Sequence, residues 1–122
     1  MNEILAPVSP GELIDKLTIL QIKSRRITDA TKLANVRREL EVLTRCWRES
    51  PWAETDIRAD EAALLAVNER LWDIEDRIRD KERARTFDAG FIELARAVYI
   101  ENDERATIKK RINTALGSTI VE

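Results

Sequence analysis

The most informative absence in this sequence is histidine. The 122 residues include no histidine and a single cysteine, Cys46. Histidine is the usual general base near neutral pH and the commonest metal ligand, so His-based catalytic triads and most zinc and iron sites are excluded. One cysteine cannot form an internal disulfide bond, which fits a reducing compartment, and we expect a cytoplasmic protein. We expect neither a metal site nor a cofactor.

Turn-forming residues and long apolar runs are also scarce. Glycine and proline number three each, too few for a turn-rich β fold. No apolar run approaches the roughly 20 residues of a membrane span, and no secretory signal pattern is visible. The net charge of -2 gives no general attraction to nucleic acid or to an anionic membrane. The chain has 43% hydrophobic residues, too many for a disordered protein, and 36% charged residues, above the usual quarter. Its length suggests a single domain.

Four segments combine helical apolar spacing with helix-capping residues. Ser9 and Glu12 form a capping box around Pro10, Asp88 is a second N-cap, and Gly117 is a suitable stop. The predicted helices cover residues 10–26, 30–48, 56–84 and 89–116. Because the linkers between them are short, consecutive helices should pack antiparallel. The sequence therefore predicts an all-α fold: an antiparallel bundle of about four helices in a single domain, 1–122, with a short extended N-terminal arm.

Polar side chains occupy the face of segment 89–116 where a core should lie. Asn102, Arg105 and Lys109 interrupt its apolar stripe in mid-helix. On segment 56–84, Glu75 lies about 40° from Leu71 around the helix axis, within the apolar arc. Arginine and lysine are rarely buried without a partner, because an unpaired buried charge is very costly. We therefore expect a polar, net cationic layer inside the bundle.

Three interpretations of this polar layer stay open. It could be an internal salt-bridge network of Glu75 with Arg79, Arg105 and Lys109, which would set register more than stability. It could be a pocket for a small anionic ligand, a carboxylate or a phosphate. It could also leave the bundle and extend its cations to water. As a site, Glu75 is the candidate catalytic acid or base, and the candidate ligand-binding residues are Asn68, Arg79, Asn102, Arg105, Lys109 and Arg37.

The first predicted helix, 10–26, has a second apolar face. Ile19 and Ile22 lie opposite the stripe formed by Leu13, Leu17 and Leu20. A helix that is apolar on two sides is either central in its fold or part of a subunit contact. We expect a homodimer formed through Ile19 and Ile22.

Three stretches carry a resemblance to a known family: "VSPGELIDKLTILQIK", "LANVRRELEVL…LWDIEDRIRDKE" and "FIELARAVYIENDERATIKKRIN". The chain resembles a family of small bacterial all-helical proteins of unknown function, sometimes encoded near surface-polysaccharide genes. The resemblance implies a bacterial, cytoplasmic helical protein and points to surface-glycan metabolism. It supplies no activity, ligand or catalytic residue. A binding or accessory protein is therefore the first functional hypothesis.

Two enzyme alternatives rest on weaker likenesses. The polar layer is similar in outline to the all-helical chorismate mutases, which hold a dicarboxylate between cations, although their characteristic opening pattern is missing here. The paired acids in "DIED" at 73–76 and "ENDE" at 101–104 are similar to the magnesium-binding acids of all-helical nucleotide pyrophosphohydrolases. However, Asp73, Asp76 and Glu104 face away from the predicted core. Whether the protein is an enzyme stays open.

Overall fold

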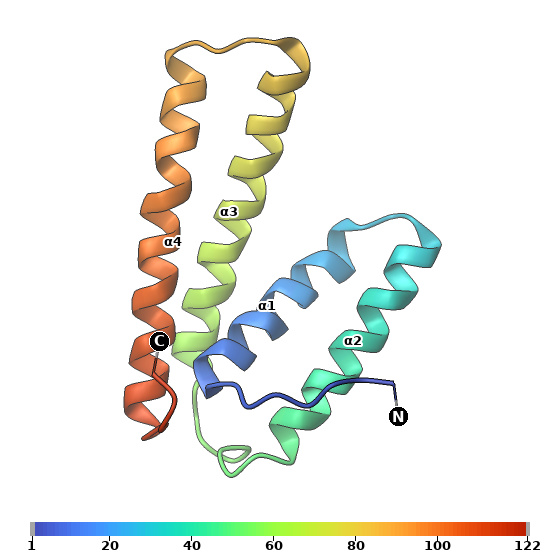
Figure 1. The fold of residues 1–122 in the computed structure, drawn as a ribbon, viewed down its shortest axis with the longest axis vertical. Helices are drawn as coiled ribbons and strands as arrows, with labels where there is room; N and C mark the ends of the chain where they lie inside the picture. The colour runs from blue at the N-terminus through green and yellow to red at the C-terminus, as the bar shows by residue number, and fades with distance from the viewer. Residues whose placement is uncertain (1, 122) are drawn as a thin grey trace.

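The computed structural model describes residues 2–121 and contains four α-helices and no strand within that range (Figure 1). The helices are α1 (Pro10–Arg26), α2 (Ala30–Arg48), α3 (Arg58–Ala84) and α4 (Ala89–Ala115). They confirm the all-α fold and the expected extended N-terminal arm, in which Ile4 is 94% exposed. The expected bounds agree closely, except that α3 begins two residues later than predicted.

The four helices form two antiparallel hairpins, α1–α2 and α3–α4 (Figure 1). Helix α1 packs against each of the other three helices, whereas α2 packs against α1 alone among the described helices. Both helices of the second hairpin have 27 residues, so α3–α4 extends well beyond the level of α1. The bundle is therefore open, and its centre is α1.

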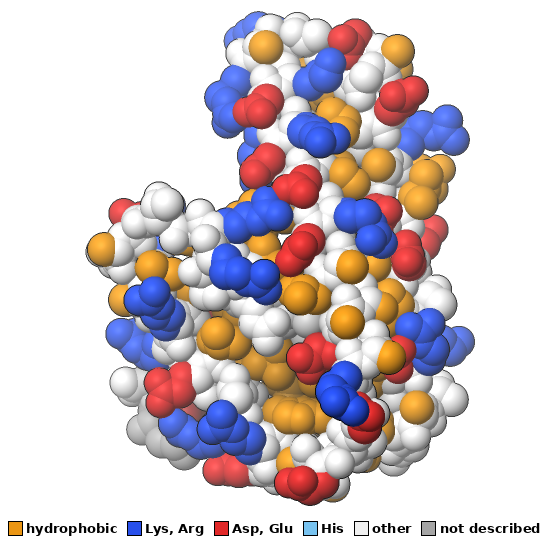
Figure 2. Space-filling view, turned by 180° about the vertical axis from the view of Figure 1, so that it is seen from behind, with side chains coloured by type: hydrophobic (Ala, Val, Ile, Leu, Met, Phe, Trp, Pro, Cys, Tyr) orange, Lys and Arg blue, Asp and Glu red, His pale blue; other side chains and the backbone are white. Residues whose placement is uncertain are grey.

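The core lies where α1 crosses the α3–α4 hairpin. Its buried apolar side chains come from α1, α3 and α4: Leu13, Ile14, Leu17, Leu64, Val67, Leu71, Ile108 and Ile112. Side chains of α2 such as Leu40 and Leu43 pack against this core but are only partly buried. Seen from the side opposite to the view of Figure 1, the α3–α4 hairpin carries interspersed positive and negative side chains with hydrophobic ones between them (Figure 2). No helix among residues 2–121 has both the length and the hydropathy to span a membrane.

Local sequence signals explain most helix ends. The Ser9 hydroxyl accepts the amide hydrogen of Glu12 at 3.1 Å, and the Asp88 carboxylate accepts that of Phe91 at 3.0 Å. Gly117 follows α4 with φ of 66°, in the left-handed region where glycine is unstrained. Helix α3 is different, because its N-cap residue Ile57 makes no side-chain cap hydrogen bond. The Asp56 carboxylate, one residue before the N-cap, accepts the amide hydrogen of Arg58 at 3.1 Å instead, so the helix begins two residues after its predicted start.

The start of α1 is held against α4 by a close backbone contact at Gly11. Its amide donates a hydrogen bond of 2.7 Å to the Asn113 side-chain oxygen. A Cβ atom at Gly11 would lie 2.5 Å from the Lys109 carbonyl oxygen and 2.8 Å from Asn113 Oδ1. Only glycine allows this approach, which brings the first turns of α1 onto the polar face of α4.

The central position of α1 corrects the expected subunit contact. Ile22 is 2% exposed within the single chain, and Ile19 is half-buried. Both line a pocket together with residues of α3, so the second apolar face of α1 points into the fold, where Ile19 is still partly exposed to the pocket. Ile22 has no surface to offer a second copy, and the assignment of a dimer contact to it was wrong. The formation of a homodimer as such stays a prediction.

Candidate functional site

The centre of the polar layer is a carboxylate from α1, Asp15. It is fully buried and accepts three side-chain hydrogen bonds. Asn68 of α3 donates one at 2.9 Å, and Arg105 of α4 donates two, from Nε at 2.9 Å and from Nη2 at closer range. The second N–H of the Asn68 amide donates to the Thr18 hydroxyl, also at 2.9 Å. The three helices thus meet in a hydrogen-bonded network in which the buried charge is paired.

The ion pair fixes both the charge and the position of Arg105. The hydrogen bond to Asp15 raises the pKa of the guanidinium above its usual range, while burial acts in the opposite direction. Arg105 keeps 28% of its side chain exposed, whereas Asp15 has none exposed. Arg105 therefore joins the buried carboxylate to the solvent side of the site.

Lys109 forms a second ion pair with α1, one helical turn further along α4. Its ammonium lies 2.5 Å from a carboxylate oxygen of Glu12. The two cations predicted on the inner face of α4, Arg105 and Lys109, thus both pair with acidic side chains of α1. The first interpretation, a network around Glu75, is met in part: the pair of Glu75 with Arg79 is present at 3.7 Å on the exposed surface, and the charge of Glu75 acts on Arg105. The carboxylate that Arg105 binds directly, however, is Asp15. The third interpretation, extension of these cations to water without partners, is wrong.

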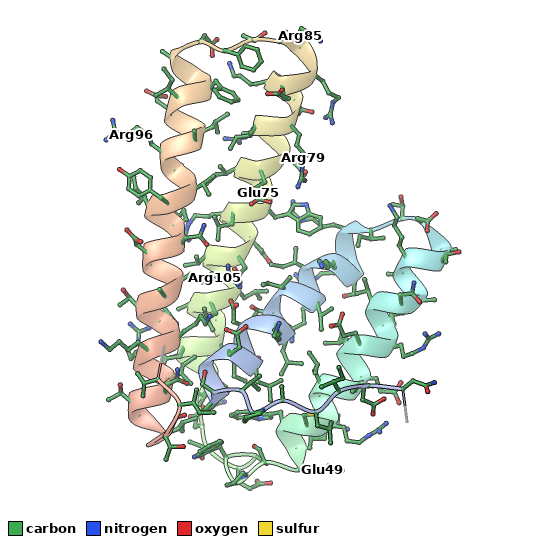
Figure 3. All side chains as sticks on the ribbon, in the orientation of Figure 1. Glu49, Glu75, Arg79, Arg85, Arg96 and Arg105 are labelled. Atoms are coloured by element: carbon green, nitrogen blue, oxygen red, sulfur yellow. The ribbon has the colours of Figure 1, made fainter. Side chains whose placement is uncertain are left out.

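A pocket of about 280 Å³ lies beside this network, in the notch where α1 diverges from the α3–α4 hairpin (Figure 3). Its lining residues come from α1, α3 and α4: Ile19, Ile22, Lys23, Asn68, Leu71, Trp72, Glu75, Asn102 and Arg105. The structure therefore gathers four of the predicted site residues, Asn68, Glu75, Asn102 and Arg105, around one cavity. Its volume is at the small end of the range for ligand pockets.

The other three predicted site residues lie outside this pocket. Arg37 is exposed on α2, the helix that packs only against α1. Arg79 is exposed on α3 beyond Glu75 (Figure 3) and contacts Glu75 and Asp76. Lys109 is held by Glu12 and does not line the cavity. Of the predicted cations, only Arg105 reaches the pocket.

Several polar groups of the pocket have hydrogen-bonding capacity left. Arg105 has five N–H groups; two donate to Asp15 and one to the Asn102 oxygen at 3.3 Å, so two have no hydrogen-bond partner among residues 2–121. Within residues 2–121, no hydrogen bond uses the Asn102 side-chain N–H groups or the Asn68 side-chain oxygen. Lys23 forms no ion pair with any described residue and faces the same cavity. The pocket thus presents unsatisfied donors from Lys23, Arg105 and Asn102, and acceptors from Asn68 and Glu75.

The sequence interpretation missed three site residues, Asp15, Thr18 and Lys23, all on α1. A signal for Asp15 was present: stepping around the helix places it about 20° from Ile22 and 40° from Ile19, on the second apolar face. An acid in the middle of an apolar face needs a partner. Assigning that face to the interior, instead of to a second copy, would have identified Asp15 as the counter-ion of Arg105.

The acids that suggested a magnesium site are distributed over surface ion pairs. Asp73 pairs with Arg26 at 2.5 Å, and Arg70 pairs with Glu101 at 2.9 Å and Glu104 at 3.3 Å. Among residues 2–121, no three His, Cys, Asp or Glu side chains lie close enough together to hold a metal ion. The pyrophosphohydrolase alternative gains no support from this arrangement.

Comparison with known proteins identifies one family. The model of a family of unknown function, DUF6165, matches residues 4–122. No curated protein and no solved structure matches the chain. Function must therefore be inferred from the site itself.

Proposed function

This chain belongs to the DUF6165 family, and we propose that it binds a small anionic molecule, a carboxylate or a phosphate, in the pocket between α1, α3 and α4. The observation that carries the proposal is Lys23, which lines the pocket and whose ammonium group has no ion pair or hydrogen bond with a described residue. Free N–H groups of Arg105 and Asn102 line the same cavity. Charge-assisted hydrogen bonds from such donors are the usual means of holding a carboxylate or phosphate.

The position of Arg105 favours binding because it is preorganised. Its guanidinium is held by Asp15 before any ligand arrives, so little side-chain freedom is lost on binding. The apolar wall formed by Ile19, Leu71 and Trp72 can cover the carbon skeleton of a ligand. A pocket with a few fixed polar groups on an apolar wall is the common design of small-molecule sites.

Binding is a better-supported role than catalysis. Glu75, the candidate acid or base, is half-exposed, and its carboxylate contacts only Arg79 among described residues, at 3.7 Å. Carboxylates that act as general acids or bases are usually desolvated or held in place by a neighbour. A chorismate-mutase-like reaction would also need several cations around the substrate, and Arg105 is already neutralised by Asp15. The enzyme alternative therefore stands second.

The biological setting is proposed from the family resemblance. Proximity to surface-polysaccharide genes, as that resemblance suggests, points to a bacterial cytoplasmic protein that assists surface-glycan metabolism. Acidic sugars such as uronic acids carry a carboxylate on a compact ring. They are therefore sensible first ligands to test in this pocket, together with inorganic phosphate.

The proposal is tested by NMR titration of the ¹⁵N-labelled chain with glucuronate and with phosphate, using glucose as the neutral control. We expect saturable shifts at the Trp72 indole and the Asn68 and Asn102 side-chain amides with an anion, and none with glucose. The Lys23→Gln variant should weaken binding. The Lys32→Gln variant, at an exposed lysine of α2, should not. Shifts that are absent, scattered, or insensitive to Lys23→Gln would overturn the proposal.

A further inference from the structure

The charged side chains around the pocket are of both signs, so the pocket is not simply cationic. Lys23, Arg105 and Glu75 line it, and the fully buried Asp15 lies directly behind Arg105. Because Asp15 neutralises Arg105, the positive charge left to act on a ligand is Lys23. The negative charge is Glu75, whose ion pair with Arg79 is long, at 3.7 Å, and lies on the exposed surface. A site for a purely anionic ligand has no use for the carboxylate of Glu75, which would repel it.

Lys23 and Glu75 do not neutralise one another. They line the same cavity from α1 and α3, yet no ion pair joins them. The two asparagines of the pocket likewise offer opposite kinds of hydrogen-bonding group to a ligand. Among residues 2–121, no hydrogen bond uses the N–H donors of Asn102 or the acceptor oxygen of Asn68. Opposite charges that line one pocket without pairing with each other can each be satisfied by a third partner with complementary charges, and the exposed Arg79 holds Glu75 only loosely, at 3.7 Å.

We infer that the natural ligand is a zwitterion, a small molecule with both a carboxylate and an ammonium group. This inference rests on the proposed function and specifies its ligand class. The carboxylate is bound by Lys23 and the free N–H groups of Arg105 and Asn102. The ammonium is bound by Glu75 and the side-chain oxygen of Asn68. The carbon skeleton packs on the apolar wall that includes Trp72.

Matched compounds that differ only in the ammonium group test the inference. The chain is titrated with 4-aminobutyrate and 4-hydroxybutyrate, and then with 6-aminohexanoate and 6-hydroxyhexanoate to vary the length, while the Trp72 and side-chain amide signals are followed by NMR. A partly exposed ion pair strengthens binding by roughly threefold to fivefold, so we expect the amino compound to bind tighter by that factor in at least one pair.

Two variants show whether Glu75 causes the preference. In Glu75→Gln, the amino compound should bind more weakly and the hydroxy compound slightly more tightly, so that the preference disappears. Glu82→Gln is the matched control, an exposed glutamate of α3 outside the pocket, and should keep the preference.

The outcomes separate the two proposals. If both members of each pair bind equally and Glu75→Gln changes nothing, the zwitterion inference fails while anion binding stands. If no compound, including glucuronate and phosphate, perturbs the pocket signals, the proposed function fails and the inference fails with it.

Discussion

Asp15 and Arg105 form an ion pair whose two members differ in their access to water. Removing Arg105 leaves a carboxylate that is fully buried, whereas Arg105 itself is partly exposed. Breaking a buried pair by deleting one partner typically costs about 3–5 kcal/mol, because the other charge stays uncompensated. We therefore expect Arg105→Met to lower the free energy of unfolding by about that amount at pH 7, measured by urea denaturation.

Two further variants control this prediction. Lys110→Met, at an exposed lysine of α4, should change stability by less than about 0.5 kcal/mol. The double variant Asp15→Leu/Arg105→Met removes both charges and should recover much of the loss, since apolar side chains often replace a buried pair without cost. A loss below about 1 kcal/mol for Arg105→Met would contradict a tight, buried pair.

Gly11 is the second residue at which a single change should be costly. An added Cβ would lie 2.5 Å from the Lys109 carbonyl oxygen, and backbone cannot move aside easily. Overpacking of this kind typically costs about 1–3 kcal/mol, so we expect Gly11→Ala to be destabilised by that amount in thermal or urea unfolding. Gly90→Ala is the matched control, because the nearest atom to its Cβ, at 3.0 Å, is the end of the long Lys81 side chain and not backbone. Equal stability of the two variants would refute the close approach of α1 to α4.

At the residue scale, the sequence was a better guide to which side chains point inward than to which residues they pair with. Periodicity correctly placed Asn102 and Arg105 on the inner face of α4, because the angle around a helix follows from residue number alone. The pairing of Arg105 with Asp15 spans 90 residues and depends on how two helices cross. A single sequence contains no measure of that crossing, so Asp15 was not among the predicted partners, and Glu75 was the partner in one of the three interpretations.

At the scale of the element, the first turn of α4 depends on a charged cap. Hydrogen bonds from the Lys81 ammonium and the Phe91 amide lower the pKa of Asp88 below its usual range, and desolvation acts against them. The folded state therefore favours the carboxylate. Its stabilising effect is complete above the usual aspartate pKa of about 4 and is lost as pH falls through the lowered folded value.

We accordingly expect the first turn of α4 to fray in acid before the core unfolds. Amide exchange or chemical shifts of Phe91, followed by NMR from pH 6 down to pH 2, measure this fraying. Asp88→Asn is the control, because asparagine still accepts the Phe91 hydrogen bond but does not titrate in this range. If Asp88→Asn shows the same acid transition at Phe91, another group is responsible.

The helix ends show what is predictable about an element. Ser9, Asp88 and Gly117 act within one turn of their own positions, so they were readable from the sequence. The N-cap residue of α3 is Ile57, which cannot cap through its side chain; Asp56, one residue earlier, accepts the Arg58 amide instead. The other end of α3 is Arg85 in a left-handed conformation, with φ of 54°. Neither Ile57 nor Arg85 carries a helix-end signal, and the expected start of α3 was early.

At the scale of the whole molecule, short linkers predicted the antiparallel hairpins but not how the hairpins meet. A bundle closed around one axis would place α2 against α3 or α4, whereas α2 packs only against α1. The stripe of α2 is accordingly only half-buried at Leu40 and Leu43. The notch that forms the candidate site exists because α1 diverges from the α3–α4 hairpin, which no linker length encodes.

This open arrangement predicts two levels of stability along the α3–α4 hairpin. Near α1, Val67 and Ile108 are 1% and 3% exposed; toward the tip, Ile92 and Tyr99 are 57% and 53% exposed. Fewer buried contacts lower the free energy of local opening. Amide groups near the tip should therefore exchange through a partial opening that costs less than global unfolding, while Val67 and Ile108 exchange only when the whole chain unfolds.

Native-state hydrogen exchange at increasing urea concentrations separates these two levels, because a partial opening exposes less surface and depends less on urea. Equal exchange free energies and equal urea slopes along the hairpin would show that α3–α4 unfolds as one unit.

The pocket lies between the stable part of the hairpin near α1 and the less stable part toward the tip. Arg105 lines the pocket on the α1 side, and Glu75 lines it on the side of the tip (Figure 3). A ligand that contacts both Glu75 and Arg105 should therefore slow amide exchange from the core toward the tip. The gain in exchange free energy should increase with the ratio of ligand concentration to Kd. Protection that stops at Arg105 in the presence of a saturating ligand would mean that Glu75 takes no part in binding.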